Sequence, residues 1–207
     1  MRSMPAATDT PIFSPITHLL YLHGFRSSPQ SAKARQMAQH MAAHHSGVIW
    51  NCPQLPPSPQ DAMALLQDTT ADWPEESMAV VGSSLGGVYA TALAEQLGCR
   101  AVLINPAVNP ARDLAAYIGA QTQWHSPEEN FYFHAHYVDE LHALQPGALG
   151  SPQHYLALIA KGDEVLDWHE MYVRYQETHI TVLEGGDHAL SDFPNHLPRI
   201  MRFLGLK

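Results

Sequence analysis

Short apolar segments, repeated along the chain and separated by segments of helical periodicity, limit the fold of this sequence more than any other feature. Six of them carry almost no polar residue and span only five or six positions, which is typical of strands that are covered on both faces. These predicted strands are residues 18–22, 47–51, 78–82, 101–105, 155–160 and 179–183.

Segments with helical periodicity connect the predicted strands. They are residues 31–45, 58–73, 84–97, 110–119, 168–177 and 196–205. A regular alternation of strand and helix predicts a parallel sheet with helices on both faces. A chain of 207 residues fits a single domain with a substantial core. We therefore expect one α/β domain over residues 1–207, built on a mostly parallel, doubly wound sheet of about six strands.

Two segments depart from this alternation. Residues 121–150 lie between two predicted strands and are rich in aromatic residues and His. Long connections of this kind are usually functional, so we expect a small cap or lid near the site. Residues 1–15 lack the compact apolar stretch of a secretory signal and are predicted to form a flexible tail.

Charge and cysteine content argue against several classes of protein. The formal net charge of −9 disfavours binding to nucleic acid or to an anionic membrane surface, both of which attract basic patches. The cysteines, Cys52 and Cys99, are too few for a secreted disulfide framework. No apolar run approaches the ~18 residues of a membrane span. Together these features predict a cytoplasmic protein, and they leave its oligomeric state open.

The sequence GSSLG at residues 82–86 matches the pattern G-x-S-x-G, with Ser84 at its centre. Gly82 and Gly86 lie two positions to either side of Ser84, whereas Ser83 has bulky residues at those positions. The pattern presents a serine on a sharp strand-to-helix turn with a strained backbone, where side chains at the glycines would collide with neighbouring elements. Because an apolar strand precedes it and a helix follows, we predict that Ser84 is a nucleophile rather than part of a packing turn.

A serine hydroxyl needs a base to take its proton and an acid to orient that base. In this type of fold the chain order is Ser, acid, His, and the groups lie at the carboxyl ends of parallel strands. Asp163 follows the predicted strand at 155–160, and His188 follows the strand at 179–183 in a glycine-containing loop. We therefore expect Asp163 to be the acid and His188 to be the base.

Two other carboxylates compete for the role of the acid. Asp167 lies four residues beyond Asp163, but Asp167 and Glu170 are spaced as a capping box for the next helix, which explains Asp167 without catalysis. Glu164 is a third and weaker candidate.

Ester chemistry also needs donors for the oxyanion that develops during attack. The residue after the nucleophile, Leu85, provides one backbone N–H, and the second is expected from the loop after the first strand. Phe25 is the candidate in that loop, with Gly24 permitting close approach. Ser27 and Ser28 are predicted to cap the helix that follows.

The motifs LLYLHGFRSSPQSAKA, VVGSSLGGVYAT, INPAVNPARDL, KGDEVLD and EGGDHAL occur in this order from about residue 17 to the end of the chain. Together they resemble the YqiA-type esterases of the α/β-hydrolase superfamily. The resemblance implies carboxylesterase activity toward short-chain acyl esters, with Ser84, Asp163 and His188 as the catalytic triad. A small acyl ester would be the binding partner, and this chemistry needs no cofactor.

Other functions remain open on the sequence alone. The same machinery could act on thioesters, and a hydrolase fold could also serve a non-catalytic binding protein. Trp124, in the predicted cap, is a candidate for lining the acyl pocket. His134, His136, His142 and Asp139 could form a zinc site, although a polar cap segment with scattered His explains them more simply.

Overall fold

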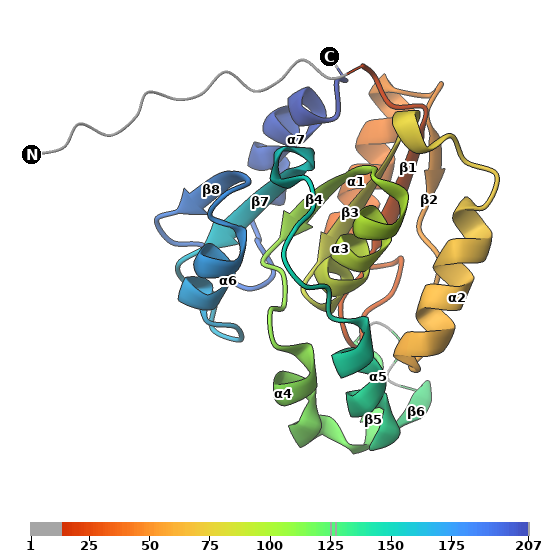
Figure 1. Cartoon of the computed structure of the whole chain (residues 1–207), viewed down its shortest axis with the longest axis vertical. Helices are drawn as coiled ribbons and strands as arrows, with labels where there is room; N and C mark the ends of the chain where they lie inside the picture. Colours follow the sequence, from red (N-terminus) through yellow and green to blue (C-terminus); the bar gives the residue numbers. More distant parts are fainter. Residues whose placement is uncertain (1–13, 125, 127, 207) are drawn as a thin grey trace, which may run out of the picture.

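The computed structural model describes residues 14–124, 126 and 128–206; the predicted tail therefore lies outside the described residues except for its last two positions. Six strands form one sheet in the order β2-β1-β3-β4-β7-β8, and all five pairings are parallel (Figure 1). The strands are β1 (His18–Leu22), β2 (Ile49–Asn51), β3 (Met78–Ser83), β4 (Arg100–Ile104), β7 (Tyr155–Ala160) and β8 (His179–Leu183). The predicted parallel, doubly wound sheet is confirmed.

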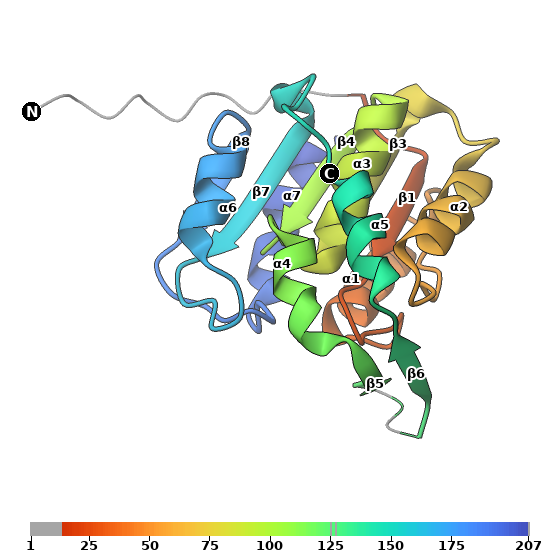
Figure 2. The same cartoon turned by 60° about the horizontal axis from the view of Figure 1, so that its bottom comes forward.

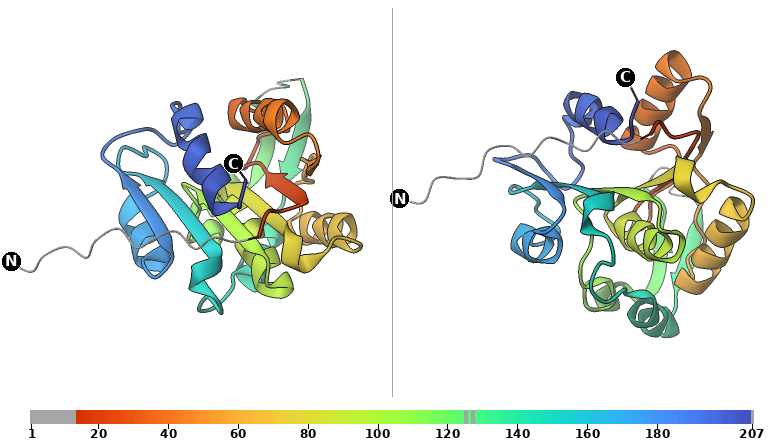
Figure 3. Two further views of the ribbon diagram at one scale, coloured as in Figure 1. Left: turned by 90° about the horizontal axis from the view of Figure 1, so that it is seen from above. Right: turned by 45° about the horizontal axis from the view of Figure 1, so that its top comes forward.

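Helices cover both faces of this sheet, as Figure 3 shows from two sides. The helices α1 (Ala32–His44) and α7 (Leu197–Phe203) pack on one face. The opposite face is covered by α2 (Pro59–Thr70), α3 (Leu85–Leu97) and α6 (Trp168–Tyr175). The helices α4 (Pro110–Leu114) and α5 (His136–Leu144) extend this second layer toward one end of the sheet.

The apolar sequence of each central strand follows from this double cover. In β1, Leu20 and Leu22 pack into the core beneath α2 and α3, whereas Leu19 and Tyr21 pack into the core beneath α1 and α7. All four side chains are fully buried. Successive strand residues point to opposite faces, so a strand with helices on both sides needs apolar residues at every position.

The segment between β4 and β7 differs most from the prediction. The helix predicted at 110–119 ends at Leu114 and continues as a short 3-10 turn, after which Gly119, with φ +131°, starts a new strand. Strands β5 (Gly119–Thr122) and β6 (Asn130–Phe133) form an antiparallel hairpin that is separate from the main sheet. The hairpin therefore begins two residues before the predicted insertion, and α5 follows it.

The hairpin lies beyond the end of the sheet toward which the parallel strands run (Figure 2). Helix α5 packs against α2 and α4, which ties this part of the chain to the rest of the molecule. We refer to β5, β6 and α5, residues 119–144, as the cap. Its position places it over the carboxyl ends of the strands, where sites form in parallel sheets.

The start of α1 corrects a second prediction. Ser31 is the N-cap, because its hydroxyl accepts a hydrogen bond from the Ala34 N–H. Ser28 instead accepts from the Gln30 N–H, which closes a turn ahead of the helix. Ser27 does not cap α1 either and lies at the wall of a cavity described below.

Cys52 and Cys99 are both free thiols, so no disulfide links them. Within the described ranges, no helix has the length and apolar character needed to cross a bilayer.

Candidate active site

Ser84 occupies the bend between β3 and α3 in a strained conformation, with φ +56° and ψ −122°. A non-glycine residue at such angles costs about 1–3 kcal/mol and persists only where the surroundings enforce it. Here three backbone hydrogen bonds do so. The Ser84 N–H donates to the Ile104 carbonyl at 3.0 Å, and the Ser84 carbonyl accepts from Gly87 at 2.9 Å and from Ala107 at 3.1 Å.

The glycines around Ser84 allow three chain segments to cross closely. A Cβ on Gly86 would lie 2.1 Å from the Leu22 carbonyl oxygen, and one on Gly82 would lie 2.2 Å from the Gly86 carbonyl oxygen. Neither distance is sterically possible, so both positions require glycine. A Cβ on Gly24 would lie 3.1 Å from the Ser84 Cβ, which places the loop after β1 directly beside the serine.

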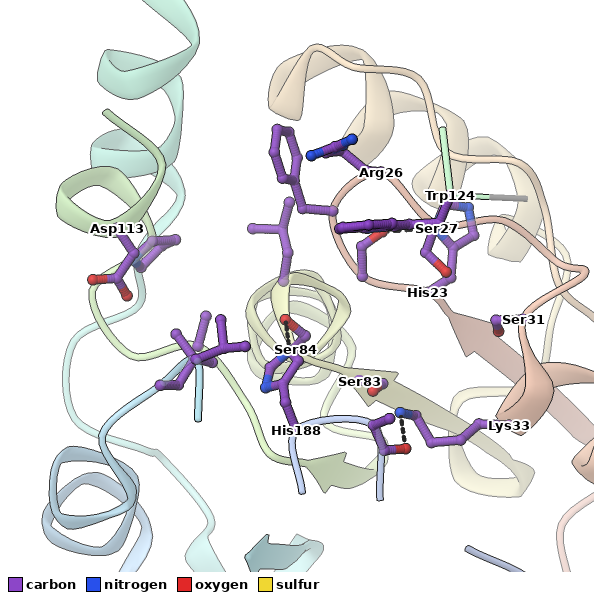
Figure 4. A pocket seen from close by; sticks show the side chains of 18 of the residues that line it. His23, Arg26, Ser27, Ser31, Lys33, Ser83, Ser84, Asp113, Trp124 and His188 are labelled. Carbon is purple, nitrogen blue, oxygen red and sulfur yellow. Dashed lines mark hydrogen bonds between the residues drawn. The ribbon is translucent and has the colours of Figure 1, made fainter. Parts of the chain in front are cut away.

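His188 and Asp163 lie next to Ser84 in one hydrogen-bonded row. His188 Nε2 is 3.0 Å from Ser84 Oγ (Figure 4), and His188 Nδ1 is 2.8 Å from Asp163 Oδ2. An ionised carboxylate only accepts, so it fixes the proton on Nδ1 and leaves Nε2 as the acceptor for the serine hydroxyl. The structure thus brings together the three side chains predicted from the sequence.

The Asp163 side chain is fully buried, with 0% exposure, whereas His188 retains 21%. Its second carboxylate oxygen, Oδ1, accepts from the backbone N–H groups of Val165 at 2.9 Å and Leu166 at 2.8 Å. Two backbone donors and the imidazole therefore satisfy a carboxylate that is out of contact with water. Buried charges with such partners hold a fixed position and orient what they bind.

Asn105 anchors the loop that carries His188, a role that the sequence analysis missed. This fully buried residue has φ +41° and follows β4 directly. Its amide nitrogen donates to the backbone carbonyls of Asp187 at 3.0 Å and His188 at 3.2 Å, and its oxygen accepts from the Ala160 N–H at 2.8 Å. One side chain therefore joins the ends of β4 and β7 to the loop after β8. A polar residue directly after a buried strand was the available indication.

The competing carboxylates have other partners. Asp167 caps α6, accepting from the His169 N–H at 2.8 Å, and this hydrogen bond lowers its pKa. The predicted capping box is wrong, because Glu170 pairs with Arg112 at 2.7 Å instead of returning to Asp167. Glu164 accepts from the His188 backbone N–H at 3.0 Å, so it supports the His188 loop from its other side.

The two predicted oxyanion donors both belong to residues beside Ser84. Leu85 is the first residue of α3, where backbone N–H groups have no acceptor within the helix. Phe25 follows Gly24 in the loop after β1, and Phe25 and Leu85 both line the cavity above the serine. His23 steadies this loop, since its ring contacts the Gly24 carbonyl at 3.0 Å and accepts from the Leu55 N–H at 3.1 Å.

The cap is fastened to this same loop through Phe25. The ring of Phe25 makes edge-to-face contacts with Tyr117, Phe131 and Phe133, at centroid distances of 5.4, 6.0 and 5.3 Å. Two of these partners belong to β6, so the aromatic cluster joins the hairpin to the residue whose N–H is the candidate donor.

Arg26 makes the second link between loop and cap. Its guanidinium donates to the Thr122 carbonyl at 2.7 Å and to the Thr122 hydroxyl at 2.9 Å. The same guanidinium lies 4.3 Å from the centroid of the Trp124 ring, and the Arg26 carbonyl accepts from the Trp124 N–H at 2.8 Å. Arg26 therefore holds both the end of β5 and the residue predicted to line the acyl pocket.

A cavity of about 650 Å³ opens above Ser84, large enough for a small ester. Much of its wall is apolar, and Tyr117, just before the cap, and Trp124 of the cap contribute to the lining. The other residues that line this apolar part are Ala107, Pro110, Leu114, Val165 and Leu166. The sequence predicted Trp124 as a pocket residue and Phe25 and Leu85 as oxyanion donors, but none of these others.

The zinc site considered for the His residues and Asp139 of the cap is not formed. The rings of His134 and His136 stack at a centroid distance of 5.3 Å. In the part of the chain that the structure describes, no group of three or more His, Cys, Asp or Glu side chains is arranged to hold a metal ion.

Comparison with known proteins gives a family and a fold. The model of the Uncharacterised protein family (UPF0227) matches residues 18–205. A similar solved structure is a protein of Agrobacterium vitis S4 named as a candidate hydrolase, with a TM-score of 0.70, 18% identity and coverage of 92% of this chain and 90% of that chain.

Two further solved structures carry descriptions of ester chemistry. One is reported for the metagenome-derived lipolytic enzymes LipS and LipT, with a TM-score of 0.67, 19% identity and coverage of 93% of this chain and 95% of that one. The other is Est1E of Butyrivibrio proteoclasticus with ferulic acid bound, with a TM-score of 0.63, 13% identity and coverage of 98% and 90%. At these identities the matches show that the chain has the α/β-hydrolase fold.

Proposed function

The chain belongs to the uncharacterised protein family UPF0227, the YqiA-type family that its motifs predict, and we propose that it is a serine carboxylesterase for small or short-chain acyl esters. The single observation that carries the proposal is the row of Ser84, His188 and Asp163 beneath an open cavity. Description of related folds as lipolytic enzymes supports the same class of reaction.

In the first step, Ser84 Oγ attacks the carbonyl carbon of the bound ester while His188 Nε2 takes the hydroxyl proton. The C–O bond to the alcohol then breaks, and the imidazolium returns the proton to the departing alcohol. Asp163 stabilises the positive charge on the ring and keeps its orientation, which its buried, doubly hydrogen-bonded position allows.

The oxyanion formed in this step would be held by the backbone N–H groups of Phe25 and Leu85. Loss of one such donor typically raises the barrier by about 3 kcal/mol. Because both donors belong to the backbone, their position depends on the loop after β1 and on the start of α3 rather than on any side chain.

In the second step, water replaces the alcohol. His188 takes a proton from water, the hydroxide attacks the acyl carbon, and the carboxylic acid leaves as Ser84 regains its proton. Neither step needs a cofactor. A cytoplasmic location remains a prediction from the sequence.

A chain-length series of p-nitrophenyl esters on wild type and Ser84→Ala tests this proposal. Wild type should hydrolyse short acyl chains, and Ser84→Ala should lose at least about 10³-fold in kcat. A fluorophosphonate probe gives an independent reading, because only an activated serine reacts rapidly with it.

Ser83→Ala is the matched control, since this neighbouring serine ends β3, whereas the hydroxyl hydrogen-bonded to His188 Nε2 is that of Ser84. It should remain labelled by the probe, whereas Ser84→Ala should not. Labelling that disappears with Ser83→Ala and survives in Ser84→Ala would contradict the assignment. Rates on matched oxygen and sulfur esters would separate an esterase from a thioesterase.

A further inference from the structure

Lys33 lies at the cavity wall, on the first turn of α1, in a position that is unfavourable for a cation in two ways. The N-terminus of a 13-residue helix carries partial positive charge, which repels an ammonium group placed there. The side chain is also partly buried, and this desolvation lowers the pKa of Lys33 to about 8, although Asp187 and Asp163 act to raise it. The helix N-terminus and the partial burial both disfavour the positive charge of Lys33. An anionic ligand bound beside the ammonium would offset both effects.

The Lys33 ammonium group has few acceptors of its own. It donates to the carbonyl of Ala189, the residue that follows His188. Among the described residues, no carboxylate lies within the 4.0 Å of a salt bridge to it. An ammonium group carries three N–H donors, so the Lys33 ammonium can donate to a further acceptor in the cavity.

Two hydroxyls lie with Lys33 on the same side of Ser84. Figure 4 shows Lys33, Ser31 and Ser27 on one side of the serine and Asp113 on the opposite side. Asp113 pairs with Arg112 at 2.7 Å, so it neutralises a cation at its own end of the cavity and none at the Lys33 end. The Lys33 side of the cavity thus carries an ammonium group and two hydroxyls and lies opposite Asp113.

We propose that the Lys33 end of the cavity binds a carboxylate carried by the ester substrate, with the ammonium as its counter-charge and the Ser27 and Ser31 hydroxyls as further donors. This inference rests on the proposed esterase function and names the class of ester that the enzyme prefers. A carboxylate fits better than a phosphate monoester, which carries roughly two negative charges. One ammonium group would not balance that charge, and the Arg26 guanidinium of the same cavity already donates to Thr122.

Pairs of esters that differ only in a carboxylate test the proposal. For the acyl side, p-nitrophenyl butyrate is compared with mono-p-nitrophenyl glutarate; for the alcohol side, phenyl butyrate is compared with 4-(butyryloxy)benzoate. Wild type should show a higher kcat/KM for the charged member of one pair, and that pair identifies which half of the substrate reaches Lys33. Lys33→Met should lower the charged-to-neutral ratio about 10-fold or more, the size expected for a charged hydrogen bond.

Lys33→Arg retains the charge and should retain a ratio above that of Lys33→Met, which separates loss of recognition from misfolding. If Lys33 served only to position His188 through Ala189, both members of each pair would slow equally. An unchanged ratio in Lys33→Met would therefore overturn the proposal. A phosphate-bearing ester that outperforms the carboxylate would overturn the choice of ligand.

Binding of glutarate to Ser84→Ala separates this proposal from the esterase function itself. Millimolar glutarate should raise the melting temperature of Ser84→Ala but not of the Ser84→Ala, Lys33→Met double variant. This result without hydrolysis in wild type would reject the esterase and keep the anion site. The opposite result is also distinguishable. If wild type hydrolyses esters but Lys33→Met changes neither glutarate binding nor the charged-to-neutral ratio of kcat/KM, the esterase function is kept and the anion site is rejected.

Discussion

At the scale of single residues, glycine and Ser84 are constrained for different reasons. Gly86 is needed because the start of α3 lies so close to the end of β1 that a Cβ would not fit. Ser84, by contrast, has an unfavourable backbone conformation, and this conformation sets the direction of its hydroxyl. The motif predicted both from spacing alone. It could not predict Asn105 or Lys33, because their roles depend on segments that are far away in the sequence.

Gly86→Ala should destabilise the protein by about 3 kcal/mol, the upper end of the usual cost of overpacking, because its Cβ would lie 2.1 Å from the Leu22 carbonyl oxygen. Urea unfolding followed by circular dichroism measures the change. Gly47→Ala is the matched control, since a Cβ there would meet nothing within 4 Å, and its free energy of unfolding should change by less than about 0.5 kcal/mol. Equal stability of the two variants would contradict the close-crossing argument.

The assignment of the acid is tested by two substitutions of the same kind. Asp163→Asn should lower kcat by about 10⁴-fold, because the amide would favour the wrong tautomer of His188. Asp167→Asn should leave kcat within about 2-fold of wild type, since Asp167 caps α6 and Asn is also a good N-cap. A large loss of kcat in Asp167→Asn with little loss in Asp163→Asn would reverse the assignment.

At the scale of helices and strands, the sequence predicted the main sheet well and the cap poorly. The four central strands are recognisable because they are buried on both faces and almost wholly apolar. The edge strands β2 and β8 are partly exposed, yet all six strands were identified within two residues of their ends. The hairpin β5–β6 has no such pattern, because its residues range from exposed Tyr132 to buried Phe133 and its stability comes from Phe25 and Arg26, almost a hundred residues earlier. Only the existence of an insertion was predictable.

Arg26→Ala should loosen the hairpin without unfolding the domain. The substitution removes two hydrogen bonds to Thr122 and the stacking on Trp124, while the main sheet is untouched. Hydrogen exchange of the amides in β5 and β6 should become faster in Arg26→Ala, and kcat/KM for esters should fall about 10-fold as the candidate oxyanion loop loses its support. Arg35→Ala, on the exposed side of α1, serves as the control. Unchanged exchange in the hairpin would show that Arg26 does not fasten the cap.

At the scale of the whole molecule, the candidate site exists only because the sheet is parallel. Ser84, Asp163 and His188 follow β3, β7 and β8, and parallel order brings the carboxyl ends of these strands to one edge. This arrangement follows from strand type and chain order, so it could be predicted without coordinates. The shape of the cavity could not, since cap, loops and α1 all contribute to its wall.

The alkylation rates of the two cysteines measure how readily each layer of the fold opens. They lie in different layers, Cys99 in the core on the α3 side and Cys52 against the core on the α1 side, and burial raises the pKa of each thiol to about 12. Because the thiolate is the reactive form, alkylation of native protein at pH 8 should be more than about 100-fold slower than alkylation in urea. Mass spectrometry after timed iodoacetamide treatment measures both rates. Fast labelling of either thiol in native protein would show that its layer opens readily.

The position of His188 on the loop after β8, an edge strand and the last strand in the sequence, has a consequence for biosynthesis. A ribosome produces the serine long before it produces the imidazole, so a partly translated chain carries a hydroxyl with no partner to activate it. Reactivity toward esters would then appear only when the last strand has left the ribosome and joined the sheet. Nascent chains and products of premature termination should accordingly be inactive toward esters, whatever the state of their earlier strands.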